Sequence, residues 1–242
     1  MPVLPDNNVY RFRDFNFKNL ISGISTKAIG DLRRNSPYFE KNIDWFCNHL
    51  GINSDSIIRA EQVHSNKVKI VRPKDRGKIV KGVDGLLTVR KGLFLLVITA
   101  DCFPILFYDS KKHIVGILHA GWEGTSGKIV KMMISRFKSL GSQTEDINIA
   151  MGPGICAKHY EVQPDVVKRF HDEKPKLPFF KKGTKYFLDL RFANYQHLIN
   201  VGVERSNIEM TPVCTFESKD FYSSRKDKPY LTGEFGTLIG ML

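Results

Sequence analysis

The chain has 242 residues, of which 42% are hydrophobic and 26% carry a charge, as in an ordinary soluble globular protein. No apolar run approaches the ~20 residues that a membrane-spanning helix needs, so a membrane protein is excluded. Residues 1–8 lack the basic and apolar regions of a secretion signal, and we expect a cytoplasmic location.

The formal net charge of +12 raises the question of nucleic-acid binding. The basic residues are dispersed, however, and their densest run, Lys174 to Lys185, is interrupted by prolines and phenylalanines and is typical of a surface loop. We therefore do not expect a nucleic-acid partner. A positive net charge can also attract small anions such as phosphate, and this is the weaker claim that we retain.

The first half of the chain predicts strands around one helix. Alternating aromatic and polar residues predict a strand over 10–17. Ser36 and Pro37 predict the start of a helix that ends at Gly51. A strand is predicted over 57–71, with His64 inside it or at a bend.

The remaining pattern alternates strands and helices. Four short apolar runs predict neighbouring strands of one sheet, at 83–88, 93–99, 105–108 and 114–118. Helices are predicted over 125–140 and 189–201, and strands over 147–151 and 208–213. No repeat or linker divides the chain, so we expect one α/β domain over residues 1–242.

Three of the strand-like segments each end near a residue that binds soft or borderline metals. These residues are His64, Cys102 and His119. A catalytic zinc ion takes three protein ligands and keeps a fourth position for water, and imidazole and thiolate both suit zinc. The spacing matches no short zinc motif, so an inert core thiol at Cys102 and a hydrogen-bonded core histidine at His119 stay open as alternatives.

The other cysteines, Cys47, Cys156 and Cys214, form no CxxC pair, and we expect reduced thiols. Asp101 precedes Cys102 and is a candidate to orient a ligand histidine. Gly121 and Gly124 flank Trp122 and would keep the backbone close to the site. Trp122 either packs in the core or forms a stacking wall for a planar ligand.

Several sequence blocks together resemble the YfiH-like family, also called the laccase-domain, polyphenol oxidase or peptidoglycan-editing factor family. The resemblance extends from about residue 23 to the C-terminus. The most specific blocks are Ala100-Asp101-Cys102 and His119-Ala120-Gly121-Trp122. The others are Gln62-Val63-His64, Asp84 to Thr88, Gly152 to Ile155, Tyr160-Glu161-Val162, Cys214-Thr215 and Phe221 to Arg225.

The resemblance implies a single α/β domain with a mixed central sheet flanked by helices. It also implies a zinc site made by His64, Cys102 and His119, which are the residues already selected from their positions. The activities it implies are phosphorolysis of adenosine, inosine, guanosine or methylthioadenosine, and adenosine deamination. Copper-dependent phenol oxidation and peptidoglycan editing are also attached to the family.

Two positions depart from the family pattern. Glu123 stands where a basic residue is usual, which reverses a charge beside the expected pocket and would weaken phosphate binding. Lys158 and His159 stand where a cysteine pair is frequent. His159 is either a further polar group for substrate binding or a loop histidine.

Our leading hypothesis is a zinc enzyme that acts on purine nucleosides and phosphate. Zinc would bring the pKa of a bound water near neutrality for attack on adenine C6, although the HxE…PCxxC deaminase signature is absent. Phosphorolysis would need a phosphate site, for which Arg225 is the candidate clamp. Trp122, Asp101 and His159 are the other candidate substrate-binding residues.

Three further hypotheses remain. A His₂Cys set also binds copper, but the chain has seven histidines and no HxH pair for a trinuclear cluster. Cys102 and His119 could instead be the nucleophile and base of a cysteine hydrolase that edits peptidoglycan. The fourth hypothesis is a basic binding module without catalysis. No pattern marks an interface between subunits.

Overall fold

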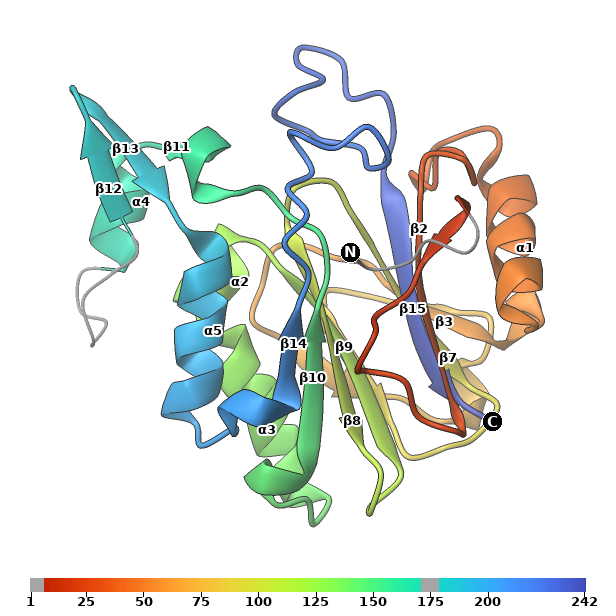
Figure 1. Ribbon diagram of the computed structural model, residues 1–242. Coiled ribbons are helices and arrows are strands. Elements are labelled where there is room, and N and C mark those ends of the chain that lie inside the picture. The colour runs from red at the N-terminus through yellow and green to blue at the C-terminus, as the bar shows by residue number, and fades with distance from the viewer. Residues whose placement is uncertain (1–6, 171–178) are drawn as a thin grey trace.

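Two six-stranded β-sheets packed face to face form the centre of the computed structural model, which describes residues 7–170 and 179–242. Helices cover the outer face of each sheet, so that the layers follow the order helix, sheet, sheet, helix (Figure 1). The expected α/β class with mixed sheets flanked by helices is confirmed. The expected single central sheet is wrong, because the strands divide between two sheets.

The first sheet holds both chain ends of the described region. Its strands are β1 (Val9–Tyr10), β2 (Leu20–Ser25), β15 (Phe235–Met241), β7 (Phe94–Thr99), β3 (Ile57–Ala60) and β5 (Ile79–Val80), in this spatial order. β7 pairs in parallel with β3 and antiparallel with β15. Helix α1 (Phe39–Leu50) covers the outer face, where Ile43 and Phe46 share an apolar cluster with Leu96 and Leu238.

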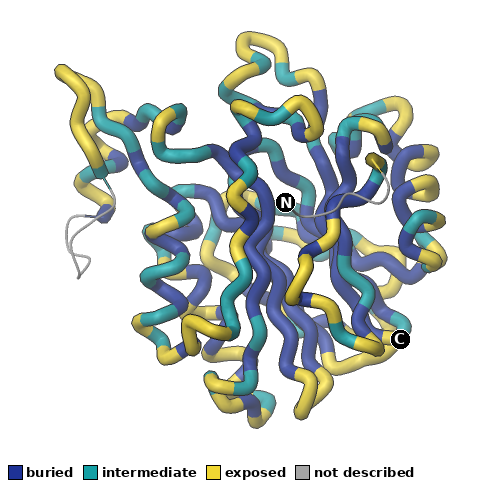
Figure 2. The backbone as a smooth tube through the Cα atoms, viewed as in Figure 1, coloured by how far each residue is buried: buried dark blue, intermediate teal, exposed yellow. Residues whose placement is uncertain are grey.

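The second sheet contains two strands that are buried along their whole length. Its strands are β14 (Ile208–Met210), β10 (Ile147–Met151), β8 (Phe103–Asp109), β9 (Ile114–Ala120), β6 (Gly85–Thr88) and β4 (Val68–Ile70). Every residue of β8 and β9 is buried, because sheet covers one face of these strands and helices cover the other (Figure 2). The covering helices are α2 (Trp122–Ser126), α3 (Ile129–Ser139) and α5 (Leu190–Asn200).

A small third sheet lies beside α5. It contains β11 (Glu161–Val162), β13 (Lys185–Leu188) and β12 (Phe179–Lys182), and it is accompanied by α4 (Pro164–Arg169) (Figure 1). The basic run expected as a loop therefore forms a hairpin from Phe179 onward. Its first part, residues 174–178, lies outside the described residues.

The apolar core between the large sheets contains side chains from both of them. Leu95 and Val97 of β7 share a cluster with Leu106 of β8 and Ile117 of β9. All four side chains are fully buried. Burial of apolar area on this scale is the main force that holds two sheets together.

Several predicted elements have different bounds in the structure. The strand predicted over 10–17 is only β1, and β7 belongs to the first sheet although it was expected beside β6, β8 and β9. The helix predicted over 125–140 is divided, because Lys128 adopts the left-handed conformation between α2 and α3. Strand β15 was not predicted.

Other local predictions are confirmed. The side chain of Asp189 accepts a hydrogen bond from the Phe192 amide at 2.9 Å and so begins α5. Gly51 ends α1 with a φ of +69°.

The single strand predicted over 57–71 is wrong, because the span forms β3 of the first sheet and β4 of the second. Of the two positions considered for His64, the structure places this residue in the turn between them.

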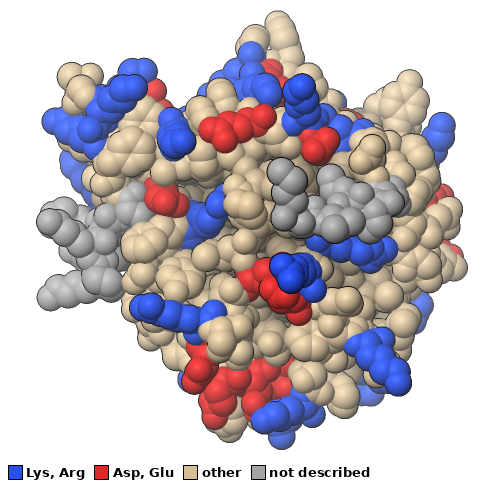
Figure 3. All heavy atoms as spheres, in the orientation of Figure 1, with Lys and Arg blue, Asp and Glu red and all other residues tan. Residues whose placement is uncertain are grey.

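Acidic and basic side chains are interspersed on the surface seen in Figure 3. The positive net charge therefore does not gather into one stripe on this face. Among the described residues, no helix has the length and apolar character needed to cross a membrane.

Candidate metal centre and pocket

The candidate site lies at one end of the two sheets, where the chain crosses from one sheet to the other. The turn with His64 leads from β3 of the first sheet to β4 of the second. Cys102 lies in the short connection from β7 to β8, which crosses in the same direction. His119 is the second-last residue of β9, and it is paired with Pro104 of β8.

These three side chains come together as the sequence predicted. The ligand atoms of His64, Cys102 and His119 all lie within 4.8 Å of one another. The two imidazole rings meet edge to face, with 4.8 Å between their centroids. His119 is buried, Cys102 is partly buried and His64 is exposed, so the cluster opens to solvent on the His64 side.

Asp84, directly before β6, fixes the two histidines. Its carboxylate accepts a hydrogen bond from His119 Nδ1 at 2.8 Å and from the His64 amide at 3.0 Å. The same carboxylate accepts bonds from the Val63 amide and from the amide and hydroxyl of Ser65. Because Nδ1 of His119 is engaged, its Nε2 is the nitrogen that can serve a metal ion.

The backbone of the His64 turn is held in an unusual conformation. Gln62 and His64 have φ values of +52° and +58°, a region that side-chain-bearing residues rarely adopt. The Gln62 amide side chain pairs with the backbone of Ile98, donating at 2.6 Å and accepting at 2.8 Å. These bonds and those to Asp84 oppose the strain, which is typical of functional sites.

Asp101 does not orient a ligand histidine, because that role belongs to Asp84. The Asp101 carboxylate accepts hydrogen bonds from the Thr215 hydroxyl at 2.6 Å and the Arg225 amide at 2.7 Å. Asp101 has a φ of +85°, and its carbonyl accepts a bond from the Ile155 amide. Asp101 therefore joins three loops behind Cys102.

The glycines around Trp122 allow the close approach that the sequence indicated. A Cβ atom on Gly121 would lie 2.9 Å from Cys102 Sγ and 3.1 Å from His64 Cδ2. A Cβ atom on Gly124 would lie 3.0 Å from the Ser65 carbonyl. The start of α2 thus packs directly on the His64 turn.

A pocket of about 420 Å³ opens above the three ligands, within the range of small-molecule sites. Trp122, Arg225 and Asp101 line it, as expected, and Glu123 lies at its exposed rim. His159 does not line it. Arg34, Arg59 and Glu234 also line the pocket and were not singled out in the sequence, because they come from distant segments. Tyr160, which lines it too, belongs to one of the sequence blocks that resemble the family.

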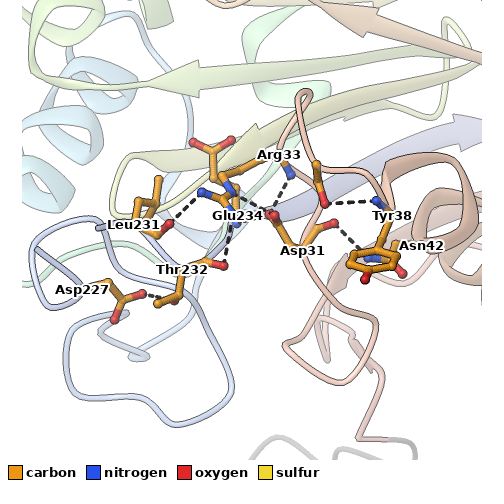
Figure 4. A network of polar contacts seen from close by, with 9 residues as sticks. Asp31, Arg33, Tyr38, Asn42, Asp227, Leu231, Thr232 and Glu234 are labelled. Atoms are coloured by element: carbon orange, nitrogen blue, oxygen red, sulfur yellow. Dashed lines mark hydrogen bonds and ion pairs between the residues drawn. The ribbon is translucent and has the colours of Figure 1, made fainter. Parts of the chain in front are cut away.

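Glu234 is a lining residue whose surroundings change its protonation. Burial, and then the nearby Asp31 carboxylate, raises the pKa of its carboxyl above the usual value. Its amide donates to the Asp31 carboxylate at 3.0 Å (Figure 4). Its carbonyl accepts a hydrogen bond from the Leu32 amide. Arg33 fixes the same loop by donating to Asp31 and to the Leu231 carbonyl.

The donor set fits a metal ion. Tetrahedral zinc with ordinary bond lengths places neighbouring sulfur and nitrogen ligands about 3.6 Å apart, which the cluster's spread of at most 4.8 Å can accommodate. Asp84 supplies the carboxylate that accompanies most metal-binding histidines. The opening on the His64 side leaves room for a fourth, exchangeable ligand.

The thiol of Cys102 is activated by its neighbours. Burial raises its pKa, but the charge and hydrogen bonds of His119 and His64 outweigh burial and bring the pKa to about 7. Burial also raises the pKa of the Asp84 carboxyl, but the hydrogen bonds that it accepts from His119 and Ser65 outweigh burial and lower the pKa to about 2. Near neutral pH the Asp84 carboxyl is therefore fully ionised, and the Cys102 thiol is close to its pKa, so that it can release the proton that metal binding displaces.

Replacing Asp84 by Asn should weaken zinc binding by about 10- to 100-fold, because the amide cannot accept all the bonds that fix His64 and His119. Zinc affinity would be measured by competition with a chelator. The buried Asp109, which accepts bonds from Lys111 and Lys112 far along β8, provides the control Asp109→Asn. Equal affinities in both variants would contradict the assigned role.

In the metal-free protein, alkylation of Cys102 should be half-maximal near pH 7, because the reactive thiolate forms as the pH rises through its pKa. Zinc should protect this thiol. Cys156 provides an internal control, since burial and the neighbouring Cys214 raise its pKa to about 11. Peptide mass spectrometry after labelling from pH 5.5 to 9 distinguishes the two cysteines. Cys102 that stays unreactive up to pH 9 would refute the prediction.

Comparisons with known proteins identify the family to which the chain belongs. Residues 29–242 match the family model described as multi-copper polyphenol oxidoreductase laccase. Purine nucleoside phosphorylase YlmD of Bacillus subtilis is 33% identical, covering 97% of this chain and 90% of that protein. Adenosine deaminase RL5, from an unknown prokaryotic organism, is 34% identical over 73% of this chain and 72% of that protein.

A solved structure shares the fold of this chain. The crystal structure of the Bacillus licheniformis protein YfiH superimposes with a TM-score of 0.93 at 27% identity, covering 99% of this chain and 98% of that one. With a family model that matches most of its length and relatives above 30% identity, the chain belongs to the YfiH-like, or laccase-domain, family.

Proposed function

We propose that this protein is a zinc-dependent purine nucleoside phosphorylase that acts in the cytoplasm. The observation that carries the proposal is the cluster of His64, Cys102 and His119 at the base of a pocket large enough for a nucleoside. The relative YlmD, which is named for this activity, is similar over nearly the whole chain. The four free cysteines agree with a reducing compartment.

His64, Cys102 and His119 would hold the metal ion, which supplies Lewis-acid polarisation of a substrate oxygen when bound. We favour zinc over copper as the metal ion in this role. A multicopper oxidase needs a second, histidine-rich cluster, and the only other such group among the described residues contains a single histidine. The protein's own contribution is to hold the three ligands rigidly through Asp84 and Gln62.

Three arginines that line the pocket are candidates to bind phosphate. Arg59 lies on β3 of the first sheet, Arg34 lies in the connection between β2 and α1, and Arg225 lies in the C-terminal loops. Arg225 donates from Nη1 to the Glu161 carbonyl at 2.7 Å and its guanidinium stacks on the Tyr160 ring, which fixes its position. A fixed guanidinium is suited to bidentate binding of phosphate.

Phosphorolysis requires a proton donor as well as an anion site. A phosphate oxygen forms a bond to ribose C1′, the bond from C1′ to the purine nitrogen breaks, and the departing purine takes up a proton. Glu234 is our candidate donor, because its raised pKa keeps a proton on the carboxyl nearer to neutral pH. Trp122 would stack on the purine ring from the opposite element, α2.

Deamination of adenosine is the second candidate, favoured by the similarity to adenosine deaminase RL5. The same Glu234 carboxyl would then protonate the purine ring while water replaces the amino group. A cysteine hydrolase is less well supported. A Cys102–His119–Asp84 relay could serve a nucleophile, but it gives no role to the strained, firmly held His64.

The test of the proposed function is turnover by the zinc-loaded protein with phosphate and adenosine, inosine, guanosine or methylthioadenosine. We expect free base and ribose 1-phosphate, or methylthioribose 1-phosphate, with His119→Ala at least 10²-fold slower because the metal is lost. Inosine formed from adenosine without phosphate would show deamination. No turnover of any nucleoside would refute the proposal and favour peptidoglycan precursors as the next substrates.

Glu234→Gln should lower kcat by about 10²-fold or more while leaving zinc content unchanged, since it removes a proton donor and no metal ligand. Glu123→Gln, at the exposed rim of the same pocket, is the matched control and should keep kcat. We expect Glu123→Arg to lower the KM for phosphate, because it removes a negative charge beside the pocket. Equal kcat values for Glu234→Gln and wild type would exclude Glu234 as donor.

A further inference from the structure

A second group of metal-binding side chains lies outside the pocket. It contains Cys156 and His159, which follow β10, and Cys214, which follows β14. Their ligand atoms all lie within 4.8 Å of one another, as in the first cluster. The proposed reaction uses none of these three residues.

The distances around His159 match the edges of a metal tetrahedron. Its Nδ1 atom lies 3.2 Å from Cys156 Sγ and 3.9 Å from Cys214 Sγ. Sulfur and nitrogen ligands of one tetrahedral zinc ion are about 3.6 Å apart, between these two values. The ring is held in this direction by stacking on Phe216, with 4.2 Å between centroids and 9° between planes.

Glu217 lies beside the cluster and is not a member of it. Its half-exposed carboxylate is 3.6 Å from His159 Nδ1, whereas the close group of ligand atoms contains only Cys156, His159 and Cys214. His159 follows Cys156 by three positions, a short spacing of the kind that places two ligands of one zinc ion on the same turn. Cys214 adds the third ligand from a distant segment.

A backbone amide also points at one of the two sulfur atoms. The Cys156 amide donates a hydrogen bond to Cys214 Sγ at 3.2 Å. Residues 157–159 form a short 3-10 turn, and the amides of Glu217 and Ser218 both donate to the Cys214 carbonyl, so both ligand segments include a closed turn. A disulfide between Cys156 and Cys214 would not require the stacked imidazole.

We propose that Cys156, His159 and Cys214 form a second zinc site with a structural role. The consequence lies in the wall of the pocket, since Tyr160 follows His159 directly and lines it. Thr215, next to Cys214, donates to Asp101, which also accepts from the Arg225 amide. Zinc at this site would join the two loops that position Tyr160 and Arg225.

The test is cobalt binding by the full-length, metal-free chain in a Cys102→Ala background, which disables the first site. Titration with Co²⁺ under reducing conditions should give one ion per chain and near-ultraviolet thiolate-to-cobalt absorption. Adding Cys156→Ala should remove about half of that absorption or abolish binding. Adding Cys47→Ala, a cysteine buried in α1 and remote from both clusters, should change neither.

A second measurement avoids substitution of the buried Cys214. Native mass spectrometry of the wild-type protein should find two zinc ions per chain, and the partly exposed His159→Ala should retain one. Equal zinc content in wild type and His159→Ala would overturn the proposal, as would a Cys156–Cys214 disulfide in protein isolated without reductant. Both readouts are metal content, so they are independent of nucleoside turnover.

Discussion

The buried carboxylate of Asp84 is the constraint on which the candidate site depends. It accepts bonds from both the His64 turn and the His119 ring, and so joins a crossing loop to a central strand. Its pKa, lowered to about 2, means that this stabilisation is complete above the usual value of 3.8 and is lost as the pH falls toward 2. One charged group thereby orients the His119 ring and holds the strained His64 turn.

The position of this group follows from the two-sheet architecture. The chain leaves the first sheet after β3 and again after β7, and both crossings occur at the same end because β3 and β7 are parallel. Strand β15, antiparallel to β7, begins at that end and delivers Glu234. Short crossings of this kind force positive φ values at Gln62, His64 and Asp101, which the surrounding hydrogen bonds sustain.

Two groups of potential metal ligands lie near the pocket, and only the first lines it. The first group contains two imidazoles and a thiol, and the second contains two thiols and an imidazole. The second group is joined to the pocket wall through neighbouring residues, because Tyr160 follows His159 and lines the pocket. Asp101, which also lines the pocket, accepts hydrogen bonds from the hydroxyl of Thr215, next to Cys214, and from the Arg225 amide.

The sequence by itself determined the local features that depend on neighbouring residues: the capped helix after Asp189, the close glycines around Trp122 and the three residues of the first cluster. Only the tertiary structure decided how strands divide between two sheets, that β15 is central, and that Asp84 rather than Asp101 orients His119. The grouping of His159 with Cys156 and Cys214 was equally invisible, because Cys214 is distant along the chain. Strand pairing and long-range hydrogen bonds arise from burial of surfaces formed by distant segments, and periodicity within one segment carries no record of its partner.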